Sequence, residues 1–459
     1  MYIPLLMCTQ HPDSTVRITA QEEVDEAVVS HLAYGCDEYM VDYEGKATPY
    51  SQPRDVVAKA LSLGLPLGER FFITPRIPNP RLEDFGRSML ALEASLLANA
   101  YSRKEAGVDA VKWIILPMTE DVDTMAFVYK AISLKAKTLA ELEALKTENI
   151  SLVPLVEDAV RQLHIDKFVR ALFRITAQSG YVLEEMRVFL GISDSAVRHG
   201  HVASALAVRR ALALLDEINR DGEYKVWPII GMGSPPFRGG VNNPRLVEAE
   251  ATQYGGYKTA TIQSAVRYDV SYKDFVRVRE VLTTPRGPGG VEIDPEWVEQ
   301  ASKLYKEAAA PHVEKVVQYA SVIPSTRDRV SWKQYGRSIT DGKPSVPRAI
   351  VYTATWYFMG LPPTFLDYSF IKWAYERGVL DQVLRALPAL KAEWEYDSAY
   401  YSPTRAMKIL GEKVVKGVEE AMDILGVAPR GDGAYLKLLE NADSEPHVVA
   451  LSRMRGFLG

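Results

Sequence analysis

Short runs of apolar residues recur along the first 270 or so positions, and a longer amphipathic stretch follows each run. The runs lack a clean alternation of apolar and polar residues, which is typical of strands covered on both faces of a parallel sheet. Their spacing of about 30 to 40 residues is what one strand and one crossover helix require. Eight runs follow this plan: Ile3–Cys8, Glu38–Tyr43, Phe71–Ile77, Val111–Met118, Ser151–Val156, Arg187–Ile192, Lys225–Met232 and Lys258–Ile262. Eight such units in series predict an α/β protein with a (β/α)₈ TIM-type barrel rather than an open sheet.

The stretches between the runs carry the signals with which helices begin and end. Thr19 and Glu22 have the spacing of a capping box ahead of an apolar helical face. The third stretch stops at Gly107, a residue type that ends helices by adopting a left-handed conformation. A later stretch, rich in Ala and Leu, is predicted as a helix with Arg209 and Arg210 on its solvent-facing side.

The pattern changes after Gln263, where strand-like runs give way to helical ones. The Pro/Gly-rich segment Thr283–Gly290 predicts a loop. Helices are predicted beyond it at Glu296–Tyr319, Ala349–Met359, Phe370–Arg377 and Arg405–Leu425, the first of them kinked near Pro311. We therefore expect a catalytic barrel over residues 1–282 and a mainly helical extension over 283–459. The extension is expected to pack on the barrel and to supply active-site arginines and subunit contacts.

Composition narrows the range of partners and locations. Hydrophobic residues make up 47% and charged residues 25% of the 459 positions, which indicates an ordinary folded chain. The net charge of -5 argues against nucleic acid as a partner. We expect neither a signal peptide nor a membrane span, because no cationic leader and no run of about 18 apolar residues occurs. Cys8 and Cys36 are too few and too widely spaced for a disulfide framework or a zinc site, which fits a reducing cytoplasm.

Carboxylates follow two consecutive strands of the predicted barrel. Glu157 comes directly after the fifth run and Asp194 directly after the sixth. Active sites of such barrels lie at the carboxyl ends of the strands, and adjacent carboxylates there commonly hold Mg²⁺ or Mn²⁺ beside a phosphorylated substrate. The alternative is that both residues are helix N-caps or surface ion-pair partners, and the pattern alone leaves the two interpretations about even.

A histidine and a glycine-flanked arginine are the next candidates. His11 lies in a turn fixed by Pro12 after the first strand, where it is either a general base or a structural residue. Arg238 lies in the loop GSPPFRGG (233–240), which is either a lid that brings a guanidinium onto an anion or an ordinary turn.

Several further cations follow the strands or lie in the extension. Lys46 belongs to the segment DYEGK (42–46), and Arg76 ends the third strand. A second group of arginines either closes over the barrel mouth to hold phosphate and carboxylate or forms only a basic surface: Arg327, Arg329, Arg337 and Arg348.

Seven segments, in order, resemble the archaeal-type phosphoenolpyruvate carboxylases. The resemblance runs from the N-terminus to about residue 370, and GSPPFRGG and DYEGK are its most distinctive parts. The segments are CTQHPD (8–13), CDEYMVDYEGK (36–46), TPRIPNP (74–80), ILPM (115–118), GISDSA (191–196), GSPPFRGG (233–240) and TIQSAVRYD (261–269).

A fainter similarity to the longer bacterial and plant carboxylases implies individual roles. It implies that His11 is catalytic, that Arg238 stabilises negative charge, and that Glu157 and Asp194 bind Mg²⁺ or Mn²⁺. Val197 replaces a lysine of those enzymes and Met232 replaces an arginine. Their tasks are expected to pass to other cations, namely Arg76, Arg198 or Lys46. The implied substrate-binding residues are Lys46, Gly239, Gln263, Arg327 and Arg348.

The resemblance also implies a reaction, its substrates and an assembly. Bicarbonate would attack the phosphorus of phosphoenolpyruvate, giving carboxyphosphate and a metal-held pyruvate enolate. Carboxyphosphate would break down to CO₂ and phosphate, and the enolate would take up CO₂ to form oxaloacetate in an anaplerotic step. The implied enzyme is a cytoplasmic homotetramer. Two other functions stay open: another metal enzyme of enolates, such as a lyase or phosphonomutase, and a catalytically inactive barrel used for binding or assembly.

Overall fold

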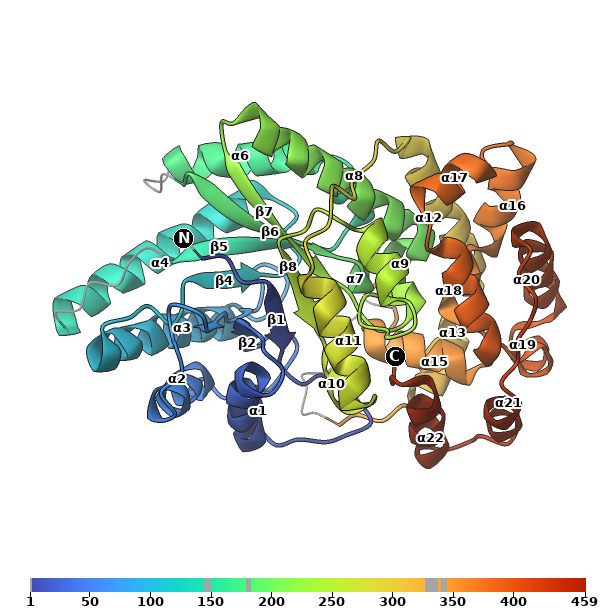
Figure 1. Cartoon of the computed structure of the whole chain (residues 1–459), viewed down its shortest axis with the longest axis horizontal. Helices are drawn as coiled ribbons and strands as arrows, with labels where there is room; N and C mark the ends of the chain where they lie inside the picture. The colour runs from blue at the N-terminus through green and yellow to red at the C-terminus, as the bar shows by residue number, and fades with distance from the viewer. Residues whose placement is uncertain (1, 144–149, 179–182, 327–336, 340–344) are drawn as a thin grey trace.

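The computed structural model contains eight parallel strands arranged as a barrel (Figure 1). The strand order is β3-β2-β1-β8-β7-β6-β5-β4, and a bridge between Arg76 and Ile115 joins β3 to β4 at the remaining seam. The strands are β1 (Leu6–Thr9), β2 (Glu38–Met40), β3 (Phe72–Ile73), β4 (Trp113–Leu116), β5 (Ser151–Val156), β6 (Glu185–Gly191), β7 (Lys225–Gly231) and β8 (Thr259–Ile262). Each predicted run contains or overlaps one of them, so the predicted (β/α)₈ barrel is confirmed. The structure describes residues 2–143, 150–178, 183–326, 337–339 and 345–459.

Helices follow the strands in the order that the sequence predicts. They are α1 (Ala20–Leu32), α2 (Gln52–Ser62), α3 (Phe85–Ala106), α4 (Val122–Glu143), α5 (Ala159–Gln162), α6 (Ile165–Gln178), α7 (Ser193–His199), α8 (His201–Asp221), α9 (Val247–Gln253), α10 (Ser264–Tyr268) and α11 (Tyr272–Thr283). The capping box of Thr19 and Glu22 is present at the start of α1, and Gly107 ends α3 with a φ of 70°. Both of these predictions are confirmed.

The prediction that Arg209 faces solvent is wrong. Its side chain is buried on α8, where Nε donates to the carbonyl of Gly289 at 2.7 Å and a terminal nitrogen donates to the carbonyl of Ala386. The face of α8 that looks polar in isolation is therefore covered by later parts of the chain. Arg210 is half-buried, and its guanidinium donates to the carbonyl of Ile293 at 2.8 Å.

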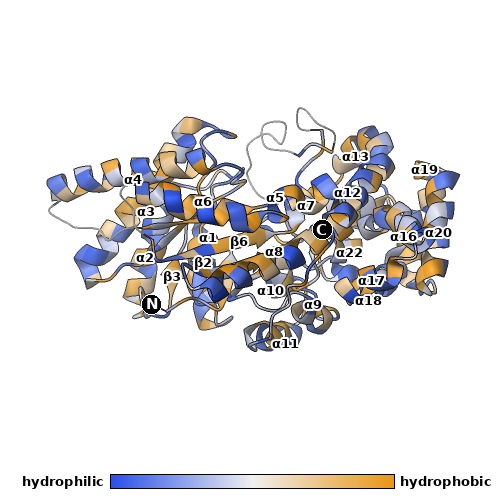
Figure 2. Ribbon diagram, turned by 90° about the horizontal axis from the view of Figure 1, so that it is seen from above, coloured by the Kyte–Doolittle hydropathy of each residue, from blue (hydrophilic) through white to orange (hydrophobic). Residues whose placement is uncertain are grey.

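The remainder of the chain forms a layer of helices beside the barrel, so that the molecule is elongated when seen from above (Figure 2). These helices are α12 (Pro295–Ala309), α13 (Val313–Ala320), α15 (Ala349–Phe358), α16 (Tyr368–Glu376), α17 (Leu380–Ala386), α18 (Leu390–Asp397), α19 (Pro403–Leu410), α20 (Glu412–Leu425), α21 (Gly433–Glu440) and α22 (Glu445–Arg455). A 3-10 turn containing Pro311 separates α12 from α13, as predicted. The single helix predicted over Arg405–Leu425 is instead two helices, because Gly411 adopts a φ of 98° between them. The division at residues 282 and 283 stays a prediction. No helix of the described residues has the length and apolar character needed to span a membrane.

A buried ion pair stiffens the interior of the barrel near the start of its strands. The guanidinium of Arg187 donates to both carboxylate oxygens of Glu38 at 2.8 Å, and it stacks 4.5 Å from the ring of Trp113. Apolar side chains that include Met40 and Phe189 lie above this pair. Because the charged groups are paired and fully desolvated, removing one partner would leave an uncompensated charge. The pair therefore links β2 to β6 inside the barrel, near the start of the strands.

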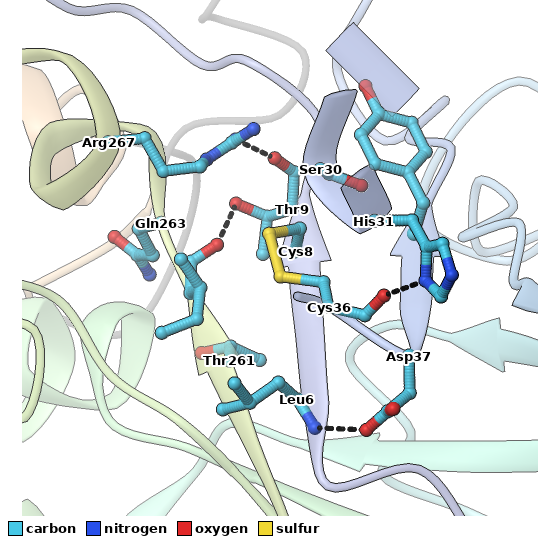
Figure 3. Close-up of a disulfide and its surroundings, with 12 residues drawn as sticks. Leu6, Cys8, Thr9, Ser30, His31, Cys36, Asp37, Thr261, Gln263 and Arg267 are labelled. Atoms are coloured by element: carbon cyan, nitrogen blue, oxygen red, sulfur yellow. Dashed lines mark hydrogen bonds between the residues drawn. A yellow bond between two sulfur atoms is a disulfide. The ribbon is translucent and has the colours of Figure 1, made fainter. Parts of the chain in front are cut away.

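The interpretation of the two cysteines as taking no part in disulfide bonding is wrong. Cys8 on β1 and Cys36, just before β2, form a disulfide with a Cα–Cα distance of 5.8 Å (Figure 3). Both are fully buried, and the Asp37 carboxylate accepts from the backbone of Leu5 at 2.8 Å beside them. Counting residues between the cysteines could not reveal this contact, because parallel pairing of β1 with β2 creates it.

Five buried ionisable groups meet where the barrel contacts the C-terminal helices. His201 begins α8, Glu250 lies on α9, Asp367 ends a 3-10 turn, and Glu393 and Asp397 lie on α18. The His201 ring lies 2.7 Å from a Glu393 oxygen. Burial raises the pKa of Asp367 and that of Asp397 to about 7. Burial, together with the neighbouring Glu393, raises the pKa of Glu250 well above its usual value. Three carboxyl groups of this seam, those of Glu250, Asp367 and Asp397, therefore have raised pKa values.

The raised pKa of Asp367 makes the stability of the seam depend on pH. A carboxyl whose pKa is near 4 when unfolded and about 7 when folded stabilises the folded state fully only below the lower value. We expect the free energy of unfolding to fall, relative to the Asp367→Asn variant, by about 1.4 kcal/mol per pH unit up to pH 7. Denaturant unfolding between pH 4 and 8 measures this difference. The exposed Asp381 supplies the control, Asp381→Asn, and an equal slope in parent and Asp367→Asn would contradict the prediction.

The disulfide is expected to stabilise the fold and to resist thiols until the chain unfolds. Closing a loop over a sequence separation of 28 is worth about 3 kcal/mol in the chain-entropy account. The Cys8→Ala/Cys36→Ala variant should lose about that free energy of unfolding. Thiol titration of the parent should find no free thiol in denaturant without reductant and two with reductant, since the chain has two cysteines. Two free thiols without reductant would contradict the account.

Candidate active site

A cavity of about 720 Å³, called here the barrel-mouth cavity, opens at the carboxyl ends of the strands. Its wall continues onto residues of α13 and α15, so the C-terminal helices complete it. The charged and amide side chains that line it are Gln10, Asp13, Asp42, Glu44, Lys46, Arg76, Glu157, Asp194, Arg238, Gln263 and Arg348. Seven of the predicted site residues therefore lie around one space: Lys46, Arg76, Glu157, Asp194, Arg238, Gln263 and Arg348.

Three buried carboxylates converge in this cavity. Glu44 follows β2, Glu157 follows β5, and Asp194 is the second residue of α7. Each offers one oxygen within 4.8 Å of the other two, and Oε2 of Glu157 and Oδ1 of Asp194 accept no hydrogen bond from the described residues. Burial first, and then Asp194 and Glu44, raise the pKa of Glu157 to about 8. An all-oxygen set of this kind fits a hard divalent cation such as Mg²⁺ or Mn²⁺, whose charge would offset the mutual repulsion.

The backbone beside Glu157 leaves room for its side chain only because residue 191 is glycine. A Cβ atom built at Gly191 would lie 2.8 Å from Cγ of Glu157. Real side chains do not approach so closely, and any larger residue would displace the carboxylate. The glycine of GISDSA, the segment that carries Asp194, therefore serves Glu157 on the neighbouring strand.

Arginines surround two of the three carboxylates. Arg348, at the N-cap of α15, lies 3.0 Å from Glu44 and also contacts Asp194. Arg337 lies 2.8 Å from Asp194 and 3.3 Å from Glu44. Burial raises the pKa of each acid, but these guanidiniums outweigh burial and hold the pKa of both Glu44 and Asp194 below their usual values. The cavity thus mixes fixed negative and positive groups, as a site for a cation and an anion requires.

A second cationic group faces the cavity from β2 and β3. Arg76 donates to Asp42 from two nitrogens, at 2.8 and 2.7 Å, and lies 3.0 Å from Glu44. The Lys46 ammonium lies 2.6 Å from the same Asp42. Asp42 therefore holds a guanidinium and an ammonium side by side at the cavity wall.

The glycine-rich loop fixes Arg238 through three different partners. Its guanidinium donates to Oγ of Ser193 at 3.0 Å, to the amide oxygen of Gln263 at 2.9 Å and to the backbone oxygen of Gly459. Burial lowers the pKa of Arg238 to about 10. Gly239 follows with a φ of 88°, a left-handed conformation that glycine adopts without strain. Movement of this loop as a lid stays a prediction.

His11 lies beside the cavity but not in its wall. The ring is buried, with Nε2 2.8 Å from the carbonyl of Val16 and 3.1 Å from Oγ of Ser14. Nδ1 lies 3.8 Å from Glu26. Burial lowers the pKa of His11 below its usual value. Gln10, Pro12 and Asp13 line the cavity from this segment, so the catalytic role of His11 stays a prediction.

Glu44 is absent from the residues predicted for the site, although the segment DYEGK (42–46) contains it. Lys46 is the predicted residue of that segment, whereas the structure brings Glu44 to both predicted metal ligands. A third carboxylate directly after a predicted strand was the available signal. Arg337 was named only within a group, and it reaches the carboxylates. Arg327 and Arg329 lie outside the described residues.

The family model and the similar proteins found by comparison carry the same description. A family model described as phosphoenolpyruvate carboxylase matches residues 3–459. A phosphoenolpyruvate carboxylase of Pyrobaculum aerophilum is 65% identical over 100% of both chains, and one of Thermofilum pendens is 49% identical over 100% of both. One of Methanosarcina barkeri is 32% identical over 92% of this chain and 88% of its own.

Solved structures show weaker likeness. A malate synthase of Haloferax volcanii, in complex with magnesium and glyoxylate, is 11% identical, with a TM-score of 0.46 over 91% of this chain and 98% of its own. An HpcH/HpaI aldolase of Desulfitobacterium hafniense is 14% identical, with a TM-score of 0.36 over 57% of this chain and 86% of its own.

The raised pKa of Glu157 predicts that metal affinity depends on pH. A carboxyl that is protonated below about pH 8 must release its proton before it can bind a cation. We expect Mn²⁺ affinity to rise up to about tenfold per pH unit toward pH 8 and then to level off. Titration calorimetry in buffers of different ionisation enthalpy measures both affinity and proton release. Constant affinity between pH 6 and 8 would contradict the prediction, and the Glu157→Gln variant should lose the pH dependence together with the affinity.

Proposed function

The chain belongs to the phosphoenolpyruvate carboxylase family, and from this premise we propose that it forms oxaloacetate and phosphate from phosphoenolpyruvate and bicarbonate in the barrel-mouth cavity. The observation that carries the proposal is the pairing of a three-carboxylate cluster with a cationic wall in one cavity. Both substrates are anions, and phosphoenolpyruvate carries a phosphate and a carboxylate that guanidiniums bind well. Full-length identity to named carboxylases favours this reaction over a lyase or phosphonomutase.

Glu44, Glu157 and Asp194 would hold Mg²⁺ or Mn²⁺. Such a cation, when bound, supplies positive charge that stabilises an enolate oxygen. Arg348 and Arg337 contact the ligand carboxylates, and they would also contact the bound substrate. They would orient the phosphate and carboxylate of phosphoenolpyruvate against the cluster.

The order of bond changes assigns tasks to the remaining cations. A bicarbonate oxygen attacks phosphorus and the bond from phosphorus to the enol oxygen breaks, which gives carboxyphosphate and the pyruvate enolate. Carboxyphosphate then divides into CO₂ and phosphate, and the enolate carbon bonds to CO₂. Arg238, held by Ser193 and Gln263, would stabilise the negative charge of the transferred phosphoryl group. Arg76 and Lys46 would neutralise bicarbonate and the released phosphate. His11 would move the proton of the carboxyphosphate.

Exclusion of water decides which product the enolate yields. A proton from solvent would convert the enolate to pyruvate, and no carbon would be fixed. Ala320 at the end of α13, with Ile323 and Pro324 after it, contributes apolar surface to the cavity wall. We assign to this segment the shielding of the enolate.

The proposal extends to location and assembly. We propose that the enzyme works in the cytoplasm as a homotetramer, which the family membership supports. The Cys8–Cys36 disulfide is compatible with a reducing compartment because both residues are fully buried and shielded from soluble thiols.

A coupled assay tests the reaction directly. Purified protein is mixed with phosphoenolpyruvate, Mg²⁺, bicarbonate, malate dehydrogenase and NADH, and each component is then omitted in turn. NADH oxidation that requires all of the first three supports the proposal. NADH oxidation without bicarbonate, or none at all from folded protein that binds Mg²⁺, would refute it.

Loss of the Arg238 side chain should impair the chemistry more than metal binding. We expect Arg238→Ala to lower turnover about 100-fold or more, because a charged donor to the transferred group is lost. Its Mn²⁺ affinity should stay within a factor of about three of the parent, because the Arg238 guanidinium donates to Ser193, Gln263 and Gly459 and not to the three carboxylates.

The exposed Arg245, which follows the same loop, provides the matched control Arg245→Ala. Turnover of the control should equal that of the parent. Parental turnover in Arg238→Ala would remove Arg238 from the mechanism.

A further inference from the structure

The strands that carry Glu157 and Asp194 stop pairing before they reach these residues. The register of β5 with β6 ends at the pair Val156 and Leu190. Beyond this pair, no backbone hydrogen bond in the described segments joins Glu157 to the turn that leads into Asp194. Beyond the ladder, side chains therefore add the contacts that join the two segments.

The first side-chain tie is the amide of Gln162 on α5. It is fully buried, and its Nε2 donates to the carbonyl of Val156 at 2.8 Å and to that of Gly191 at 3.1 Å. One accepting carbonyl lies directly before Glu157, and the other belongs to the last residue of β6. A single amide group thus spans the two strand ends at the level where the ladder has stopped.

The second side-chain tie joins the segment after β5 to the end of helix α7. Nε2 of His199 lies 2.8 Å from a carboxylate oxygen of Asp158, and Nδ1 lies 2.8 Å from Oγ of Ser302 on α12. Asp158 follows Glu157, and His199 is the last residue of α7, the helix whose first turn carries Asp194. The imidazole therefore holds the helix of one carboxylate against the segment of the other, with α12 as the support.

A steric contact limits how closely the two strand ends can approach, while the two ties limit how far they can separate. Gly191 already lies so close to Glu157 that an added Cβ would meet Cγ at 2.8 Å, so the strand ends have little room to approach. Gln162 and His199 restrain the same gap from widening. Mg²⁺ requires oxygen ligands at about 2.0 to 2.1 Å in nearly octahedral geometry, so a small change in separation affects its binding.

We propose that Gln162 and His199 are positioning residues that set the separation of Glu157 and Asp194 for a divalent cation. The inference rests on the proposed function, because it takes these two carboxylates as ligands. Neither residue lines the barrel-mouth cavity, so their effect passes through the backbone that they hold. Partners that orient metal ligands in this way typically change metal affinity about 10- to 100-fold when they are lost.

Mn²⁺ binding, followed by the electron paramagnetic resonance of the free ion, tests the proposal without reference to turnover. Gln162→Leu keeps much of the side-chain volume and removes both hydrogen bonds. His199→Ala removes the imidazole contacts to Asp158 and Ser302 and leaves Arg198 of α7, 3.1 Å from Asp158, in place. His199→Gln keeps an N–H group able to reach Asp158. We expect about 10- to 100-fold weaker Mn²⁺ binding in Gln162→Leu and His199→Ala, with most of the loss recovered in His199→Gln. The KM for Mn²⁺ should rise by a larger factor than the factor by which turnover at saturating Mn²⁺ falls.

Gln253 supplies a matched control for general destabilisation. It is also a buried glutamine whose amide bridges two segments, accepting from the backbone of Ala389 at 3.0 Å, but it lies away from the cavity. Gln253→Leu should lower the unfolding temperature and leave Mn²⁺ affinity unchanged. Equal weakening in Gln253→Leu and Gln162→Leu would overturn the proposal, since both would then reflect stability alone.

The Glu157→Gln variant distinguishes an error in the ligand assignment from an error in the positioning roles. Weak Mn²⁺ binding in Glu157→Gln together with parental binding in both Gln162→Leu and His199→Ala would overturn the positioning roles alone. Parental binding in Glu157→Gln would overturn the ligand assignment, and the positioning roles with it. Circular dichroism confirms folding, and if Gln162→Leu does not fold, the comparison of His199→Ala with His199→Gln decides.

Discussion

Repulsion among Glu44, Glu157 and Asp194 is the constraint on which the rest of the site depends. Three buried carboxylates, each with an oxygen within 4.8 Å of the other two, would not all remain ionised without compensation. Arg337 and Arg348 provide part of it, while burial first, and then Asp194 and Glu44, still raise the pKa of Glu157 to about 8. In the proposed site a divalent cation would complete the balance. The proposal that a cation and an anionic substrate share one cavity rests on this need for both kinds of positive charge.

The fold supplies this arrangement by bringing together residues that are distant in sequence. Glu157 and Asp194 follow the neighbouring strands β5 and β6, whereas Glu44 follows β2 in another part of the barrel, and the ring of strands makes all three converge. The arginines come from beyond the barrel, where α15 places Arg348 at its N-terminus. The seam of buried carboxyl groups between α8, α9 and α18 holds the two parts together. The C-terminal helices therefore complete the cavity in which the proposed chemistry takes place.

Local patterns in the sequence were enough to predict the barrel, because each strand and helix carries its own periodicity and caps. The same patterns located Glu157, Asp194 and Arg238, since the ends of predicted strands are known positions in such a fold. Contacts between segments that are distant in the sequence could not be predicted from these local patterns. Arg209 looks solvent-facing until Gly289 and Ala386 cover it, and the Cys8–Cys36 disulfide appears only once β1 pairs with β2. His11 follows a strand as predicted, yet its ring turns toward Val16 and Glu26, a direction that no sequence motif specifies.

Anomalous diffraction from crystals grown with Mn²⁺ tests the central claim most directly, because it locates the ion without reference to activity. The account predicts one strong anomalous peak in the barrel-mouth cavity, with oxygens of Glu44, Glu157 and Asp194 as its protein neighbours. The peak should disappear in crystals of Glu157→Gln grown in the same way. A peak at another place, or a peak in this cavity that Glu157→Gln leaves unchanged, would contradict the account.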